Sequence, residues 1–307
     1  MTDPDGATAW VSVLRSDASE FQNAANAARA KGHGIDLRGQ NLKGLDLTTV
    51  DLTGADLTGA DLTGAQIVAE HVSMCRLEAT TLDAVSSDGD LSGVYLLAAI
   101  WAGDSFPNPR PSVMADVDFS AATLPAVDLR DLMFRHSNLA GADIRACTVR
   151  RTAFPFSDLT GVRADDSTLE WMDCRGSDLT DANFDGCTLV TPVFEDATLH
   201  RTSFRDATLT KVQGTGAEAA GVIFASATLA DPALDEANLS LADFRDAHLD
   251  GPIFCASDLS GADFRGAIIS GFSDFEDANV AGADFRGAQL PEGCLDNAQG
   301  VEKARFE

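Results

Sequence analysis

The chain has 307 residues, of which 45% are hydrophobic, and its 48 acidic and 22 basic side chains give a net charge of -26. This apolar content is typical of an ordered protein, and the length fits either two average domains or one long repeat array. The excess of acid excludes direct nucleic-acid binding as the expected role, because phosphate contacts need Lys and Arg in excess, and it favours a protein partner with a basic surface.

The first segment, residues 1–34, is expected to form a helix that caps the end of the fold. Residues 7–31 have helical composition with apolar side chains near one stripe, and Gly32 is a candidate for the residue that ends the helix. The N-terminus lacks the basic and apolar regions of a signal peptide, and no apolar run approaches the roughly 18 residues that a membrane helix needs. We therefore expect a cytoplasmic protein that does not enter a membrane.

A repeat of five residues occupies much of residues 35–296, most regularly in VDLTGADLTGADLTGAQ at 50–66. The helix repeats its faces about every 3.6 residues and the strand about every 2, so neither period explains this spacing. The central apolar residue of each repeat is called position i below. The first block of repeats runs from Leu37 to Leu82, and the main block runs from Phe119 to Ile269.

Residues 86–118 interrupt the repeats. The prolines of FPNPRPS in this segment predict an extended, projecting loop. Loops that leave a regular scaffold often carry specific contacts, although an insertion that only bends the fold explains the segment equally well. The candidate partner-binding residues of this loop are Asp104, Phe106, Pro107, Asn108, Pro109, Arg110 and Pro111.

The main block also repeats at an interval of 20 residues. Threonines recur at this spacing at Thr148, Thr168, Thr188, Thr208 and Thr228. Such a ladder is explained if each coil lies directly on the previous one, so that stacked hydroxyls can hydrogen-bond. Four repeats then make one turn, with coils about 4.8 Å apart and about twelve coils in all. Side chains at i and i-2 fill the interior, and Gly near i+2 allows a positive φ at the corners.

Two irregularities follow the main block. One residue is inserted near residues 270–273, after which the five-residue series resumes, and residues 297–307 form a short tail. The repeats VDLTGADLTGADLTG, at 50–64, and ADFRGA, at 262–267 and 283–288, resemble the pentapeptide-repeat family, whose motif is A(D/N)LXX. The resemblance implies an all-β fold, a right-handed quadrilateral β-helix, in agreement with the coil inferred from the spacing.

Charge is unevenly distributed over the predicted sides. The triplets Asp243-Phe244-Arg245, Asp263-Phe264-Arg265 and Asp284-Phe285-Arg286 place acid and base beside each other, where they largely neutralise one another. Another side carries acids at position i-1 with few basic neighbours. We interpret this side as an acidic stripe for partner binding, formed by Asp118, Asp158, Asp178, Glu218 and Asp258.

Two functional hypotheses remain open. Carboxylates recurring at about 4.8 Å loosely imitate the phosphates of a DNA strand, which lie about 3.4 Å apart. The resemblance to the quinolone-resistance and self-immunity members of the family implies binding to DNA gyrase or topoisomerase IV in place of DNA, with protection against quinolones or toxins. Those members are shorter and usually dimerise through a C-terminal helix. The short tail of this chain, residues 297–307, does not obviously provide such a helix, so we expect a monomer or a weak homodimer. The alternative is a structural scaffold or protein–protein adaptor without DNA mimicry.

An enzyme is not expected. The predicted interior holds Leu, Phe, Ala and Thr, and the sequence contains none of the patterns G-x-S-x-G, H-E-x-x-H or a phosphate-binding loop. The acids occupy outward positions instead of converging on a pocket. The six Cys and five His are scattered without a C-x-x-C pair, so we predict neither a metal site nor a cofactor.

Overall fold

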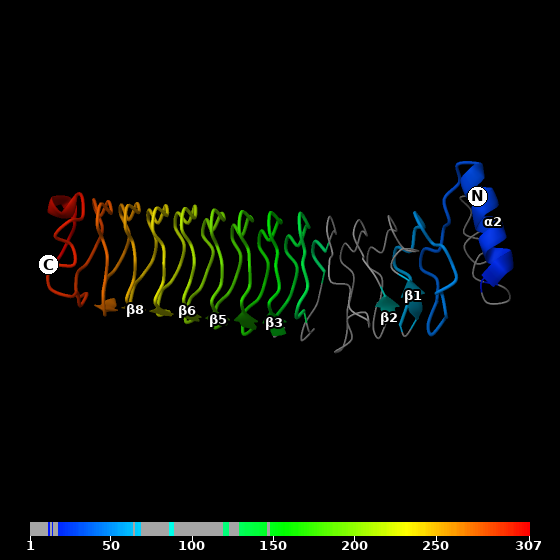
Figure 1. Cartoon of the computed structure of the whole chain (residues 1–307), viewed down its shortest axis with the longest axis horizontal. Coiled ribbons are helices and arrows are strands. Elements are labelled where there is room, and N and C mark those ends of the chain that lie inside the picture. Colours follow the sequence, from blue (N-terminus) through cyan, green and yellow to red (C-terminus); the bar gives the residue numbers. More distant parts are fainter. Residues whose placement is uncertain are drawn as a thin grey trace. The chain divides into compact units, whose positions relative to one another are not determined.

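The computed structural model divides into two compact units, residues 1–143 and 144–307. Each unit is described by itself (Figure 1). The described residues are 12, 14, 18–63, 65–68, 86–88, 119–122, 129–145 and 148–307.

The first unit begins with helix α2, Ala18–Ala30. Its residues Phe21 and Ala25, one helical turn apart, are fully buried. The helix ends at Ala30, and it is followed by Gly32, whose φ of 72° is left-handed, while the His33 N–H donates to the Ala28 carbonyl at 3.0 Å. The predicted N-terminal helix is therefore confirmed in its described part, and Gly32 follows its end.

The helix contacts the coils that follow it in the first unit. The backbone N–H of Asp51 donates to Oε1 of Gln22 at 2.8 Å, so the polar side of the helix satisfies a backbone group of a coil. The coils pair at an offset of twenty residues, for example Asp36 with Asp56. Strand β1, Gln66–Val68, pairs in parallel with β2, Ser86–Asp88. The loop predicted at residues 104–111 lies outside the described residues.

The second unit contains a parallel sheet of seven strands in chain order. Figure 1 shows these strands side by side in a row along the lower edge of the stacked coils. The bounds are β3 Thr148–Arg150, β4 Thr168–Glu170, β5 Thr188–Val190, β6 Thr208–Thr210, β7 Thr228–Ala230, β8 His248–Asp250 and β9 Ile268–Ser270. The predicted threonine ladder is confirmed, since Thr148 pairs with Thr168 and the series continues to Thr228.

Three further columns of parallel bridges complete each coil, as in the pairs Ala153–Asp173, Asp158–Asp178 and Arg163–Asn183. Four columns per twenty residues make a four-sided parallel β-solenoid, so the predicted fold class is confirmed. The total of about twelve coils is not confirmed, because part of the repeat region lies outside the described residues. The right-handed sense stays a prediction.

Stacked phenylalanines fill one side of the interior. Phe184, Phe204, Phe244 and Phe264 are fully buried. Phe244 and Phe264 stack with ring centroids 4.7 Å apart and planes inclined by 5°. A stack at the spacing of the strands keeps the interior dry and adds aromatic contact to apolar burial.

Most described corners of the coils take a left-handed backbone conformation, as predicted from the glycines near i+2. Many corners nevertheless carry another residue, most often Asp. Thr191 is the least favourable of them, because it is β-branched, has a φ of 51° and precedes Pro192. The equivalent corner two and three coils later is occupied by Asp231 and then by Gly251, each followed by proline.

We expect Thr191→Gly to raise the free energy of unfolding by about 1 kcal/mol, because glycine adopts the left-handed region without the steric penalty of a β-branched residue. Urea or thermal unfolding measures the change. The reverse replacement Gly221→Thr, at a corner with a φ of 69° where a Cβ would make only an ordinary contact, 3.8 Å from Cγ of Arg201, should destabilise by a similar amount. A Thr191→Gly variant no more stable than the wild type would contradict the strain.

Candidate protein-binding surface

The side of the second unit that covers the stacked phenylalanines carries paired charges. Nη2 of Arg245 lies 2.6 Å from Oδ2 of Asp243, and Arg265 and Arg286 pair in the same way with Asp263 and Asp284. The hydrogen bond from Arg286 lowers the pKa of Asp284 to about 2. The predicted neutralisation on this side is confirmed, so this side offers little net charge to a partner.

The predicted acidic stripe lies on a neighbouring side. Its described members belong to one column of bridges, in which Asp158 pairs with Asp178 and Glu218 and Asp258 follow. The column is not continuous in charge, because its remaining positions are Thr198, Asn238, Asn279 and Gln299. Asp118 lies outside the described residues.

The missing charge is supplied by pairs of acids at the adjoining corner. In the coils where the column holds Thr198, Asn238 or Asn279, the corner just before it carries the pairs Glu195–Asp196, Asp235–Glu236 and Glu276–Asp277. Backbone hydrogen bonds hold these corners in register, since the Gly216 N–H donates to the Asp235 carbonyl at 3.0 Å and the Ala256 N–H to the Glu276 carbonyl at 2.8 Å.

Each of the seven coils that carry β3–β9 therefore contributes at least one carboxylate to the same edge. We call this edge the acidic corner, and its residues are Asp158, Asp178, Glu195, Asp196, Glu218, Asp235, Glu236, Asp258, Glu276 and Asp277. Sequence analysis found only the residues at i-1. The signal for the pairs is a second, longer period, visible in FEDAT at 194–198, LDEAN at 234–238 and FEDAN at 275–279.

Few cations neutralise the acidic corner. Among its described neighbours, Arg175 lies with Nη1 3.8 Å from Oε2 of Glu195, and the same guanidinium is bound more closely by Asp173 at 3.0 Å. Other carboxylates accept from neutral donors instead: Nδ2 of Asn238 donates to Glu218 at 2.9 Å. Neutral donors orient a carboxylate without cancelling its charge. The edge thus presents fixed negative charges about 4.8 Å apart from coil to coil.

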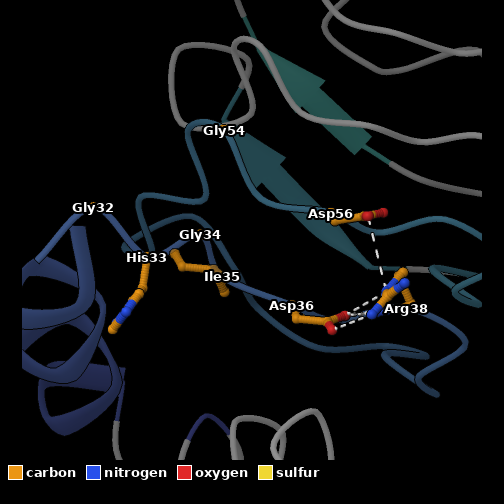
Figure 2. Close-up of a pocket in the computed structure, with 8 residues that line it drawn as sticks. All are labelled: Gly32, His33, Gly34, Ile35, Asp36, Arg38, Gly54 and Asp56. Carbon is orange, nitrogen blue, oxygen red and sulfur yellow. Dashed lines mark hydrogen bonds and ion pairs between the residues drawn. The ribbon is translucent and has the colours of Figure 1, made fainter. Parts of the chain in front are cut away.

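A cavity of about 390 Å³ lies in the first unit, beside Gly32, His33, Asp36, Arg38 and Asp56 (Figure 2). Nη2 of Arg38 lies 2.7 Å from Oδ2 of Asp36, and its Nε lies 3.9 Å from Oδ2 of Asp56. The hydrogen bond from Arg38 lowers the pKa of Asp36. His33 lies beside the helix and is turned away from this pair. The cavity therefore brings together an ion pair and no acid–base pair suited to proton transfer.

Comparison with known families matches the chain to the model of pentapeptide repeats, in eight copies at residues 33–65, 112–151 and 234–271. The matched segment 234–271 lies wholly within the described coils of the second unit. The chain belongs to the pentapeptide-repeat family. No catalytic family is indicated, and no curated protein matches the sequence significantly.

Solved pentapeptide-repeat proteins are among the structures to which the chain is similar. HetL from the cyanobacterium Nostoc sp. is 22% identical, with 91% of this chain and 94% of HetL covered and a TM-score of 0.25. QnrB1, a plasmid-mediated fluoroquinolone resistance protein, is 14% identical with 89% and 90% covered and a TM-score of 0.21. A protein of the Arabidopsis thaliana thylakoid lumen is 30% identical with 38% and 70% covered and a TM-score of 0.16. TM-scores this low carry no information on binding partners.

In the described part of this pentapeptide-repeat protein, no helix is long and apolar enough to cross a membrane. Likewise, the described residues include no cluster of three or more His, Cys, Asp or Glu side chains that could hold a metal ion.

Cys255 reports on the acidic corner, because it occupies a neighbouring position between two of the acid pairs. Partial desolvation raises the pKa of its thiol, and the negative charges of Asp274 and Glu276 raise that pKa further, as do those of Asp277 and Asp235. A raised thiol pKa means less thiolate, and hence slower alkylation, at a given pH.

Replacing Glu276 with Gln and Asp277 with Asn should accelerate alkylation of Cys255 several-fold near pH 8, since removal of negative charge lowers the thiol pKa toward its ordinary value. Peptide-resolved mass spectrometry after timed iodoacetamide treatment gives the rate. Asp206→Asn with Asp246→Asn, which removes the same charge from the corner beside the phenylalanine side, is the control and should leave the rate unchanged. Equal rates in both double variants would show that the corner exerts no such field.

Proposed function

We propose that this protein is a non-enzymatic binding protein whose acidic corner occupies the DNA-binding surface of another protein in place of DNA. The observation that carries the proposal is the succession of carboxylates, at least one on each of seven consecutive coils. They lie on a backbone scaffold that fixes their spacing. A basic surface evolved to follow a line of phosphates is the complement of such an edge.

The physical match is one of charge density. A DNA strand presents one phosphate about every 3.4 Å, and the corner presents one or two carboxylates about every 4.8 Å. Because the coils are locked by hydrogen bonds on all four sides, the charges are held apart without any ordering on binding. Preorganised charge lowers the free-energy cost of association.

The partner that we propose is a type II topoisomerase, DNA gyrase or topoisomerase IV, and the consequence for the cell is protection against quinolones or toxins. Two considerations support this choice: the family membership of the chain and the acidic edge. QnrB1 is described as a fluoroquinolone resistance protein, and the same activity is a proposal for this chain.

A second candidate function is that of an adaptor that binds a protein without imitating DNA. Phe272 favours it, because this side chain is 81% exposed in the second unit and a DNA surface offers no equivalent apolar group. An adaptor would bind its partner without displacing DNA from it.

The test of mimicry is inhibition of gyrase supercoiling, and relief of fluoroquinolone-induced cleavage, at low and moderate salt. We expect activity at micromolar protein that weakens as salt rises. A variant with Asp196→Asn, Glu236→Gln and Asp277→Asn should lose roughly tenfold in potency, because these acids face the partner and attraction between complementary charges contributes to binding.

The matched control replaces Asp166, Asp206 and Asp246 with Asn, which removes the same charge from corners of the same backbone conformation on another edge. Its potency should stay within about twofold of the wild type. A wild-type protein that neither inhibits gyrase nor protects it would overturn mimicry of DNA toward this enzyme, and co-purification without loss of DNA binding would support the adaptor function.

A further inference from the structure

The single residue inserted into the repeat of the second unit produces an exposed aromatic side chain. Paired residues keep an offset of twenty up to Asp250–Ser270, and the bridges that span the insertion, from Ile253–Asp274 to Ile268–Gln289, have an offset of twenty-one. The ladder continues unbroken, since the Asp274 N–H donates to the Pro252 carbonyl at 2.9 Å. The extra residue is therefore absorbed at the corner before Asp274, where Phe272 stands.

Phe272 projects from this corner with 81% of its surface exposed, more than any other large apolar residue in the described part of the chain. Two stacked glycines form the base. A Cβ on Gly271 would lie 3.0 Å from the backbone nitrogen of Gly251, and Gly271 has a left-handed φ of 70°. Both the close backbone and the φ favour glycine next to Phe272.

The surroundings of Phe272 are partly apolar and otherwise acidic. Ile253, on the preceding coil opposite Asp274, is 37% exposed. Along the same coil, Asp274, Glu276 and Asp277 follow within five residues of Phe272 and lead to the acidic corner. An aromatic group rimmed by charged residues is the usual form of an anchor at a protein interface.

We infer that Phe272 and Ile253 form an anchor for a protein segment in which an apolar side chain is flanked by Lys or Arg. The basic side chains of that segment pair with Asp274, Glu276 and Asp277, and the apolar side chain packs on Phe272. This inference rests on the proposed function, in that the partner approaches the acidic corner, and it adds what a mimic of DNA alone lacks: an apolar contact that selects one basic partner among many.

Charge decides between this occupant and the other surfaces that an exposed phenylalanine can meet. An anionic membrane surface would be repelled by the acids around the ring. A second copy of this side of the chain would bring the same carboxylates face to face, which is unfavourable. A basic protein segment is the occupant for which both the apolar and the charged groups find a complement.

The test uses the full chain and two synthetic peptides of equal charge. In one peptide a tryptophan is flanked on each side by two arginines, and in the other serine replaces the tryptophan. Fluorescence anisotropy over a range of salt concentrations gives the affinity and its salt dependence. We expect the wild type to bind the tryptophan peptide roughly tenfold more tightly, with the same salt dependence for both peptides.

Phe272→Ser should abolish this preference and leave the salt-dependent binding intact. Leu241→Ser is the matched control, because Leu241 is also highly exposed, at 71%, but lies on a corner away from the acidic one. Both side chains face solvent, so thermal unfolding of both variants should resemble that of the wild type. The variant with Asp274→Asn, Glu276→Gln and Asp277→Asn should weaken both peptides and reduce the salt dependence.

The outcomes separate the two proposals. Equal affinity of the wild type for both peptides, or a preference that survives Phe272→Ser, overturns the anchor while leaving the acidic corner as a binding site. Unchanged binding in the charge variant overturns the acidic corner itself. A wild-type dimer that Phe272→Ser converts to a monomer in sedimentation would assign the ring to self-association and also overturn the anchor.

Discussion

The parallel hydrogen bonding between residues twenty positions apart is the interaction on which the second unit depends. It pairs Thr168 with Thr188 and Asp158 with Asp178, and it does so on every side of the coil. Once that offset is fixed, a residue's position in the sequence determines which side it faces. A column on the surface is then simply a set of residues separated by one turn. Both the stacked phenylalanines and the acidic corner are consequences of this one offset.

The fold could be predicted because its determinants are local and repeated. Leu and Phe at every fifth position indicate the interior, and the threonines at a spacing of twenty indicate the length of a turn. Neither inference needs knowledge of distant contacts, since each coil touches only its neighbours. The corners were less predictable: Trp171 and Thr191 take a backbone conformation for which the sequence suggested glycine. Their N–H groups donate to the next coil, to the carbonyls of Val190 and Thr210, and this pairing holds the unfavourable conformation.

Sequence analysis predicted only some of the residues of the acidic corner. Asp158, Asp178, Glu218 and Asp258 were identified from one position in the repeat, and the structure places them in one column. Sequence analysis missed the acid pairs because they occupy positions i+1 and i+2 instead of i-1. They also occur only on every second coil, so they are not evident when residues are compared at a spacing of twenty. The exposure of Phe272 was also beyond the sequence. The insertion was visible, but only the resumed bridging on either side shows that the extra residue is expelled to the surface instead of shifting the following coils.

Because the acid pairs occur on every second coil, the charge pattern limits how many coils can be added or removed together. From the coil of Asp178 onward, coils with a single carboxylate alternate with coils that carry a pair of adjacent carboxylates, and the sequence that encodes them repeats about every two turns. Removing one coil from this stretch would leave every backbone hydrogen bond with a partner. It would, however, bring together two coils that both carry a pair of carboxylates, or two that both carry a single one, so the alternation of charge would be lost. Removing or duplicating two turns would preserve it. The backbone pairing therefore allows coils to be inserted or deleted one at a time. The charge pattern is kept only when coils are inserted or deleted two at a time.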